Sequence, residues 1–275
     1  MAQNFKELPV EYIRNPQPLF TFGNFNRCLD FAAETDYLQI LHADDVIKPA
    51  FYETMEKILA PCDGNAMAWC LDDRIDEQGK LLSISGRADG SLRELDKDTF
   101  LARKAEIGNQ AFCATLLKTN RQPIPARFPE DMPVMGDAVY WARYGFHCKQ
   151  IFFLNQALAQ YRWHGSTVTV KGSSNINNLI VDEWKVMEQV EALRQKKPGW
   201  LRMSKLKGIM AARSGIKAKR FREFGNPAYA KEITQTAQRY TGVPIWMAAQ
   251  FLVELREIIF FKIGGRPKHP RNVYS

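Results

Sequence analysis

The alternation of apolar runs with amphipathic helical segments is the feature that most constrains the fold of this chain. Residues 37–42, YLQILH, are mostly apolar in succession, as in a strand that is buried on both faces of a sheet. The next segment, 50–60, places its apolar residues at helical spacing, and residues 66–76 form a second strand-like run. Strands that alternate with helices are typical of an α/β fold with a mainly parallel sheet. We therefore predict such a fold, with a ligand site at the carboxyl ends of the strands.

The same signals predict the other elements of the first part of the chain. The turn residues DEQG at 76–79 indicate that the run 66–76 forms a hairpin with KLLSIS. Residues 98–118 predict a helix, a break at Ile107-Gly108-Asn109-Gln110, and the apolar run AFCATLLK. The remaining predictions are strands at 10–16 and 149–164, a strand that continues from residue 37 to residue 45, and helices at 23–36 and 136–146.

The last part of the chain differs in charge from the first. Residues 165–275 contain 20 Lys and Arg and 8 Asp and Glu, so their net charge is +12. Because the whole chain has a net charge of +8, residues 1–164 have a net charge of −4. Helical spacing from about residue 176 predicts a helical region, so we divide the chain into a domain at 1–170 and a basic extension at 171–275. The extension could contact nucleic acid, anionic lipid or an acidic polymer, or it could be a solvated surface.

Three features bear on where the chain resides. The segment 243–263 is apolar but carries Glu254, Arg256 and Glu257, which favours a helix at a membrane interface or one packed on the first domain over a spanning helix. The N-terminus lacks the apolar core of a signal peptide, and the five scattered cysteines argue against a disulfide framework or a zinc site. We predict a cytoplasmic protein whose last helix is able to contact the inner face of the membrane.

Two adjacent carboxylates, Asp44 and Asp45, follow the first long apolar run. Like charges this close repel, so a counter-charge is expected beside them. Mg²⁺ or Mn²⁺ commonly binds through one or two carboxylates together with substrate phosphates. Alternatively, the pair caps the following helix, because Asp side chains accept backbone N–H bonds at helix N-termini. These residues alone leave both interpretations open.

The order of an apolar strand, ADD, Pro49 and a helix resembles the family 2 glycosyltransferases, which have the GT-A fold. The metal motif of that family sits at this strand end, and here it stands as His42-Ala43-Asp44-Asp45. The resemblance implies that Asp44 and Asp45 bind Mn²⁺ or Mg²⁺ and that His42 contacts the donor.

Further motifs follow in the order seen in that family, over residues 10–170. The stretch GDAVYWARYGF resembles the helix whose leading acidic residue is the catalytic base, which implies that role for Asp137. The stretch LAQYRWHGSTVT resembles the end of the family's domain and implies that His164 is a further metal ligand. By the same resemblance, contacts to the donor or acceptor are implied for Asn26, Gly108, Asn109 and Arg162.

The implied activity is metal-dependent, inverting transfer of a sugar from a nucleotide-diphosphate donor to a glycan or lipid-linked acceptor. Members of the family begin with a further strand, helix and strand, so this sequence is expected to lack the first part of the nucleotide-binding unit. An inactive binding or scaffold protein is therefore one alternative. A nucleic-acid-binding protein is another; the chain carries no RRM, zinc-finger or helix-turn-helix signature, and we predict no nucleic-acid partner.

Overall fold

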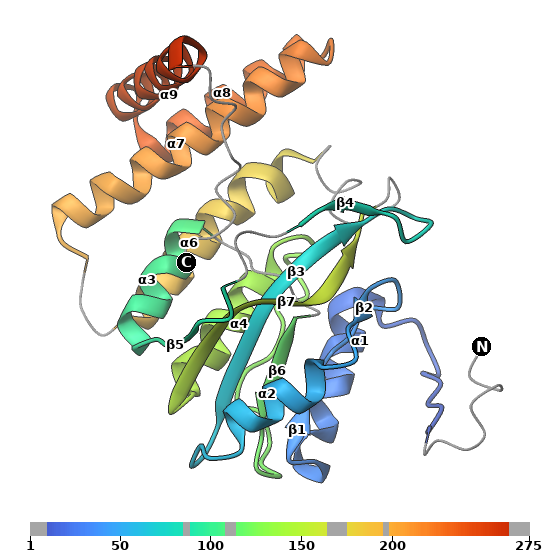
Figure 1. The fold of residues 1–275 in the computed structure, drawn as a ribbon. Coiled ribbons are helices and arrows are strands. Elements are labelled where there is room, and N and C mark those ends of the chain that lie inside the picture. Colours follow the sequence, from blue (N-terminus) through green and yellow to red (C-terminus); the bar gives the residue numbers. More distant parts are fainter. Residues whose placement is uncertain (1–9, 85–88, 108–113, 164–174, 195–197, 264–275) are drawn as a thin grey trace.

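The computed structural model describes residues 10–84, 89–107, 114–163, 175–194 and 198–263, with the side chains of the last helix described as far as Leu255 (Figure 1). Over these residues the chain has an α/β fold in which a mixed, curled sheet is flanked by helices. The predicted α/β class is therefore confirmed.

The sheet is built around two long neighbouring strands, β3 (Ala66–Ile75) and β7 (Gln150–Arg162). Over the described residues the strand order is β1-β6-β3-β7-β2, while β4 pairs with β3 and β5 pairs with β7. The short strands are β1 (Tyr37–Leu38), β2 (Val46–Ile47), β4 (Leu81–Ser83), β5 (Leu92–Glu94) and β6 (Thr115–Lys118).

The strand directions are mixed, so the predicted mainly parallel sheet is not confirmed. β3 and β7 pair in parallel, whereas the other pairings among the described strands are antiparallel. β4 has to be antiparallel because it follows β3 through the turn at 76–79, as the predicted hairpin requires. Since β6 is antiparallel to both β1 and β3, the strands β1, β3 and β7 still run in one direction.

The sheet separates two hydrophobic cores. On β3 the large side chains of Met67 and Trp69 enter one core, and the small side chains of Ala66 and Ala68 enter the other, because successive residues face opposite sides of a strand. α2 (Phe51–Leu59) covers the smaller core. The larger core is covered by α1 (Phe20–Leu29), α3 (Lys97–Ile107), α4 (Gly136–His147) and α6 (Asp182–Leu193).

Three predictions for the first 45 residues need correction. The predicted strand at 10–16 is irregular and mostly exposed, since no neighbouring strand pairs with it among the described residues. The helix predicted at 23–36 begins earlier, at Phe20, and ends in a 3₁₀ segment at Asp30–Glu34. β1 covers only Tyr37–Leu38, because the sequence continues into an irregular segment and a turn rather than along the sheet.

The C-terminal helices are joined to the α/β part through shared packing. After a short π-helical turn at Asn177–Val181, Trp184 and Met187 of α6 are buried in the larger core. α7 (Trp200–Glu223) contributes Leu206 to that core and Ala218 to a third core, which it forms with α8 (Pro227–Thr241) and α9 (Val243–Ile263). The domain boundary predicted at 170 lies outside the described residues.

A partly buried ionic network spans the same junction. Arg202 of α7 binds the carboxylates of Glu191 on α6 and Glu106 on α3. Arg194, at the end of α6, binds Glu191 as well and reaches Asp98 of α3 at 2.8 Å. Because Glu191 is only 4% exposed, removing one of its arginines would leave a buried charge with reduced compensation.

α9 packs on α7 and α8 by one face (Figure 1). Gly215 of α7 permits the close approach, since a Cβ there would lie 1.8 Å from the amide oxygen of Gln250. Trp246 is buried in this contact, whereas Met247 and Phe251 are exposed. The predicted packing of this segment on the first domain is thus not confirmed. Among the described residues, no helix is both long and apolar enough to cross a membrane.

We predict that Gly145→Ala lowers the free energy of unfolding by about 1–3 kcal/mol. An added Cβ at Gly145 of α4 would lie 2.3 Å from the ring of Phe100 on α3, and this ring is fully buried. Gly208→Ala on α7 is the matched control, because among the described residues no atom outside the nearby backbone of α7 lies within 4 Å of its added Cβ. Helix propensity predicts that the control is stabilised by about 1 kcal/mol. Urea unfolding compares the two, and an unchanged stability for Gly145→Ala would contradict this packing of α3 on α4.

Candidate metal centre

A turn at residues 42–45 brings three potential metal ligands together. The backbone N–H of Asp45 donates to the carbonyl of His42 at 3.2 Å. One ring nitrogen of His42 and one carboxylate oxygen each of Asp44 and Asp45 lie within 4.8 Å of one another. β2 follows directly and pairs with Ala159 and Gln160, which places the turn near the carboxyl end of β7. The sequence predicts that Asp44 and Asp45 end the strand that begins at residue 37, but β1 ends at Leu38, and the turn lies instead near the carboxyl end of β7.

Asp45 is the most buried member of the cluster. Its side chain is 1% exposed; Oδ1 accepts the backbone N–H of Arg162 at 2.9 Å, and Oδ2 lies 3.6 Å from Nδ1 of His42. The alternative that the aspartates cap the next helix is wrong. α2 begins at Phe51, and its N-cap residue is Ala50, which makes no side-chain capping bond.

Arg162 links the turn at residues 42–45, called the ligand turn below, to the rest of the sheet. Its Nε donates to the carbonyl of Asp44 at 2.8 Å, and Nη1 donates to the carbonyls of Asp76 at 2.7 Å and Glu77 at 3.0 Å. One guanidinium thus joins the ligand turn, the end of β7 and the β3–β4 turn. The structure shows Arg162 in this supporting role, and its predicted contact with a donor or acceptor stays a prediction.

His42 is oriented by aromatic packing. Its ring stacks on Phe25 of α1, with centroids 5.1 Å apart and an interplanar angle of 12°. Burial lowers the pKa of His42, and the nearby carboxylate of Asp44 raises it in part. A lowered pKa favours neutral imidazole, which is the form that binds metal ions.

The chemistry of these side chains fits a divalent cation. Two carboxylates supply two negative charges, and the carboxylate oxygens suit Mg²⁺ or Mn²⁺. Three protein ligands on one turn also leave coordination positions for water or for phosphate oxygens, as is usual for these ions at phosphate sites. His42, Asp44 and Asp45 are the residues that would hold the ion, so His42, predicted to contact the donor, lies among the ligands.

The side chain of Asn26 joins α1 to the loop before α4 by hydrogen bonds. Its Nδ2 donates to the carbonyl of Phe128 at 3.0 Å, and its Oδ1 accepts the N–H of the same residue at 2.8 Å. A donor contact by Asn26 stays a prediction. Three further predicted site residues, Gly108, Asn109 and His164, lie outside the described residues, and their roles stay predictions as well.

Asp137 lies in the first turn of α4, where the sequence predicts a helix with a leading acid. Its neighbour Gly136 packs against Phe22, since an added Cβ would lie 2.7 Å from that ring. Phe22 in turn lies 5.9 Å from Phe25, the ring that stacks on His42. The start of α4 and the ligand turn therefore border the same aromatic cluster.

Sequence reasoning missed a buried lysine on α3. Lys104 on α3 is 1% exposed, and within the described part of the chain no group accepts a hydrogen bond from its Nζ. Burial lowers the pKa of Lys104 to about 7, and the charge of Asp137 acts in the opposite direction. The available signal was that Lys104 falls on the apolar stripe of its helix, one turn after Phe100.

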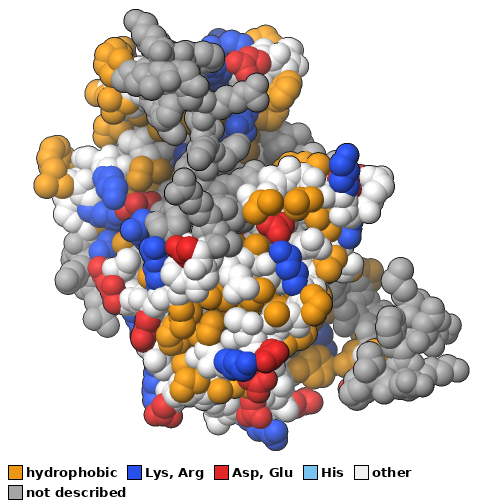
Figure 2. All heavy atoms as spheres, viewed as in Figure 1, with side chains coloured by type: hydrophobic (Ala, Val, Ile, Leu, Met, Phe, Trp, Pro, Cys, Tyr) orange, Lys and Arg blue, Asp and Glu red, His pale blue; other side chains and the backbone are white. Residues whose placement is uncertain are grey.

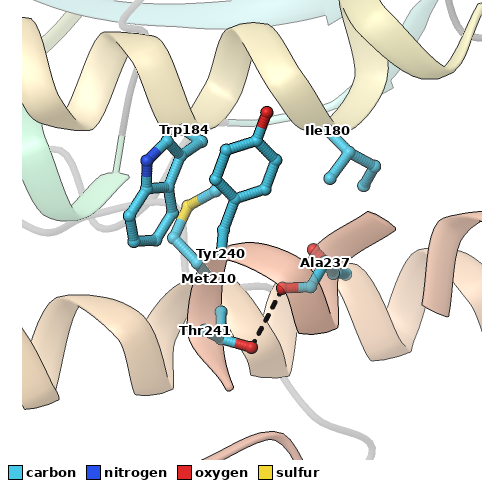
Figure 3. A pocket seen from close by; sticks show the side chains of 7 residues that line it. Ile180, Trp184, Met210, Ala237, Tyr240 and Thr241 are labelled. Atoms are coloured by element: carbon cyan, nitrogen blue, oxygen red, sulfur yellow. Dashed lines mark hydrogen bonds between the residues drawn. The ribbon is translucent and has the colours of Figure 1, made fainter. Parts of the chain in front are cut away.

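The C-terminal helices enclose a small hollow (Figure 3) that does not form a ligand site. It is lined mainly by apolar side chains, with Trp184 stacked on Tyr240 at 5.1 Å and the Thr241 hydroxyl donating to the carbonyl of Ala237 at 3.0 Å. The enclosed space leaves no room for a water molecule. The hollow is a packing feature where the larger core, with Trp184 and Met210, meets the third core, with Ile180 and Ala237.

The positive charge of the C-terminal region is partly neutralised within the fold. Glu183 of α6 binds Arg213 and Lys217 of α7, and Arg202 belongs to the network described above. On the face shown in Figure 2, basic and acidic side chains are interspersed. The absence of a nucleic-acid partner stays a prediction.

Comparison with known proteins does not identify the chain. No protein family model matches it, and no curated protein matches it either.

We predict that the full chain binds Mn²⁺ and that Asp45→Asn weakens this binding by roughly tenfold or more, because a charged ligand is lost. The amide retains an oxygen that can accept the N–H of Arg162, so the turn is preserved. Asp63→Asn is the control, since that carboxylate is fully exposed and pairs with Lys149. Titration calorimetry measures both affinities. An equal effect of the two substitutions would contradict the assignment of the site.

A second prediction concerns Lys104 and pH. The unfolded chain holds the proton of this lysine up to an ordinary pKa of 10.5, whereas the folded chain releases it near 7. The unfolded state binds more protons between these values, so stability should rise with pH by at most about 1.4 kcal/mol per unit over this window. Lys104→Met should remove this contribution, while the exposed Lys57→Met should not. Urea unfolding at several pH values measures the slopes, and parallel curves for Lys104→Met and the unchanged chain would contradict the prediction.

Proposed function

We propose that this chain is a glycosyltransferase of the GT-A type, similar to family 2, that transfers a sugar from a nucleotide-diphosphate donor to a glycan or lipid-linked acceptor. The observation that carries the proposal is the cluster of His42, Asp44 and Asp45 at the carboxyl end of β7. Ligands of open α/β sheets bind outside the carboxyl ends of the strands. A paired carboxylate cluster there suits a divalent cation that in turn binds a diphosphate.

The proposed reaction uses the residues on both sides of the aromatic cluster. Bound Mn²⁺ or Mg²⁺ would supply positive charge to neutralise the diphosphate leaving group. Asp44, Asp45 and His42 would hold that ion, and Arg162 would keep their turn in place. Asp137 would accept the proton of the acceptor hydroxyl as general base. The hydroxyl oxygen then attacks the anomeric carbon opposite the leaving diphosphate, which inverts the configuration.

We predict that the purified chain releases nucleotide diphosphate from a nucleotide-sugar donor in a reaction that requires Mn²⁺ or Mg²⁺. Asp44→Ala should abolish metal-dependent donor binding. Asp137→Asn should lower the rate by about 10²–10⁴ and leave donor affinity unchanged, because a general base acts only in the chemical step. Asp131→Asn, an exposed acid in the loop before α4, is the matched control.

The assay separates the transferase from the inactive alternative. A panel of nucleotide sugars is tested for diphosphate release with and without added acceptor glycans. Binding of Mn²⁺ and donor without release from any of them would favour the inactive binding or scaffold protein. Equal losses in Asp131→Asn and Asp137→Asn would remove Asp137 from the base role.

We propose in addition that α9 contacts the inner face of the cytoplasmic membrane, where lipid-linked acceptors lie. Val243, Met247, Phe251 and Leu255 are exposed and recur every four residues, so they share one face of the helix. The sequence that follows is basic, with Lys262, Arg266, Lys268 and Arg271. An exposed apolar stripe next to basic residues suits an anionic lipid surface.

We predict that the full chain floats with vesicles that contain anionic lipid at low salt. Met247→Glu combined with Phe251→Glu should leave the chain in the soluble fraction, because charge on the stripe opposes both apolar burial and anionic headgroups. Leu81→Glu combined with Leu82→Glu is the control, since those apolar side chains are also exposed but lie on β4. Recovery of the unchanged chain in the soluble fraction would exclude the membrane contact.

A further inference from the structure

A lysine that follows the ligand turn forms an ion pair across the sheet. Lys48 comes directly after β2, and its backbone N–H donates to the carbonyl of Leu158 at 2.9 Å, so the pairing of β2 with β7 extends to this residue. Its Nζ donates to Oδ2 of Asp73 on β3 at 2.7 Å. Because β7 lies between β2 and β3, the side chain of Lys48 crosses over β7 to reach its partner.

The sheet register places this ion pair on the same face as the side chain of Arg162. Gln160 and Asp73 are partners on the neighbouring strands β7 and β3, so their side chains share a face. Side chains alternate along a strand, so Arg162 points to that face as well. The backbone N–H of Arg162 is bound by Asp45 of the ligand turn. Two residues along a strand span about 7 Å, which separates the ion pair from the row that holds the ligand turn.

The hydrogen bonding of Lys48 differs from that of a lysine with a purely structural role. Lys118 is buried, and its ammonium, which has three N–H donors, is bound by three backbone carbonyls at the end of α2. Among the described residues, the ammonium of Lys48 has Asp73 as its acceptor, and 34% of the Lys48 side chain is exposed. Lys48 therefore retains N–H donors for a ligand that approaches from solvent.

The charges on this face favour such a ligand only if a cation is present. Asp44 and Asp45 together carry two negative charges, which a divalent ion would offset, and the carboxylate of Asp73 adds a third. Arg162 uses its guanidinium on backbone carbonyls. Lys48 offsets the charge of Asp73 and is itself partly open to solvent.

We propose that Lys48 is a phosphate-binding residue beside the ligand turn and that Asp73 positions its ammonium. The inference rests on the proposed function, in which the ion on the ligand turn binds the diphosphate of a nucleotide-sugar donor. A lysine ammonium is a compact charge that binds phosphate oxygens through charge-assisted hydrogen bonds. The donor diphosphate is then held by two cations, the metal ion and Lys48, and both stabilise the charge that develops on the leaving group.

The test is titration calorimetry of the full chain with two probes, Mn²⁺ alone and inorganic pyrophosphate at saturating Mn²⁺. The unchanged chain is compared with Lys48→Met and with Lys57→Met. Lys57 is the matched control because it is also a lysine paired with a carboxylate, that of Glu53 at 2.6 Å, but it lies exposed on α2.

We expect Lys48→Met to weaken pyrophosphate binding by about 10- to 100-fold, the effect of one hydrogen bond to a charged group, and Lys57→Met to leave it unchanged. Mn²⁺ alone should bind Lys48→Met at least as tightly as the unchanged chain, because the substitution removes a positive charge that repels the ion. Equal pyrophosphate affinities in Lys48→Met and the unchanged chain would overturn the inference. Equal losses of Mn²⁺ and pyrophosphate binding would overturn it as well, since they would indicate a structural role.

A double substitution covers the case in which Lys48→Met does not fold because the carboxylate of Asp73 has lost this cation. Lys48→Met combined with Asp73→Asn removes both charges of the pair. It should bind pyrophosphate about 10- to 100-fold more weakly than Asp73→Asn alone. Equal affinities of these two variants would overturn the inference.

The diphosphate of a lipid-linked acceptor has the same chemistry as that of the donor. Titrations with uridine diphosphate and farnesyl diphosphate, both at saturating Mn²⁺, separate the two sources. Lys48→Met should weaken binding of uridine diphosphate by the factor seen with pyrophosphate. A loss confined to farnesyl diphosphate would overturn the assignment to the donor.

These titrations do not require sugar transfer. Lys48-dependent binding of pyrophosphate by a chain that releases no diphosphate from any donor would refute the proposed function and leave the phosphate site established. A chain that releases diphosphate, but binds pyrophosphate equally well with and without Lys48, would refute the role of Lys48 alone.

Discussion

The parallel pairing of β3 with β7 is the constraint on which the rest of the structure depends. It brings the carboxyl ends of the two longest strands to one edge, where Ile75 and Arg162 lie opposite each other. Arg162 then reaches the carbonyls of both the β3–β4 turn and the ligand turn. The antiparallel strands attach to this central pair from either side, so the sheet can be mixed without displacing the cluster.

Two ionisable side chains, Asp45 and Lys104, are buried although burial of a charge is unfavourable. The carboxylate of Asp45 accepts a backbone N–H and lies near an imidazole, and the side chain of Lys104 is buried with its Nζ 5.9 Å from the ring of Phe100. Stability alone would favour apolar side chains at such positions. Of the two, Asp45 lies on the turn whose His42 stacks on Phe25 of α1.

Local patterns predicted the α/β class and the β3–β4 hairpin, because apolar spacing and turn residues are visible in short windows. The strand predicted to end at Asp44 and Asp45 stops at Leu38 instead. Strand direction could not be predicted, since an apolar run suits a parallel or an antiparallel neighbour. The clamp by Arg162 could not be predicted either, because it joins residues 118 positions apart in the chain. The burial of Lys104 could not be predicted, because it depends on the packing of α3 against the rest of the fold. The stacking of His42 likewise depends on where α1 lies.

The central claim is that the turn at residues 42–45 is a metal centre for a diphosphate ligand. Crystals of the full chain grown with Mn²⁺ and a nucleoside diphosphate, measured at the manganese absorption edge, test it directly. We predict an anomalous peak about 2.1–2.2 Å from carboxylate oxygens of Asp44 and Asp45, with a phosphate oxygen completing the coordination. A manganese peak elsewhere, or bound diphosphate away from this turn, would contradict the account.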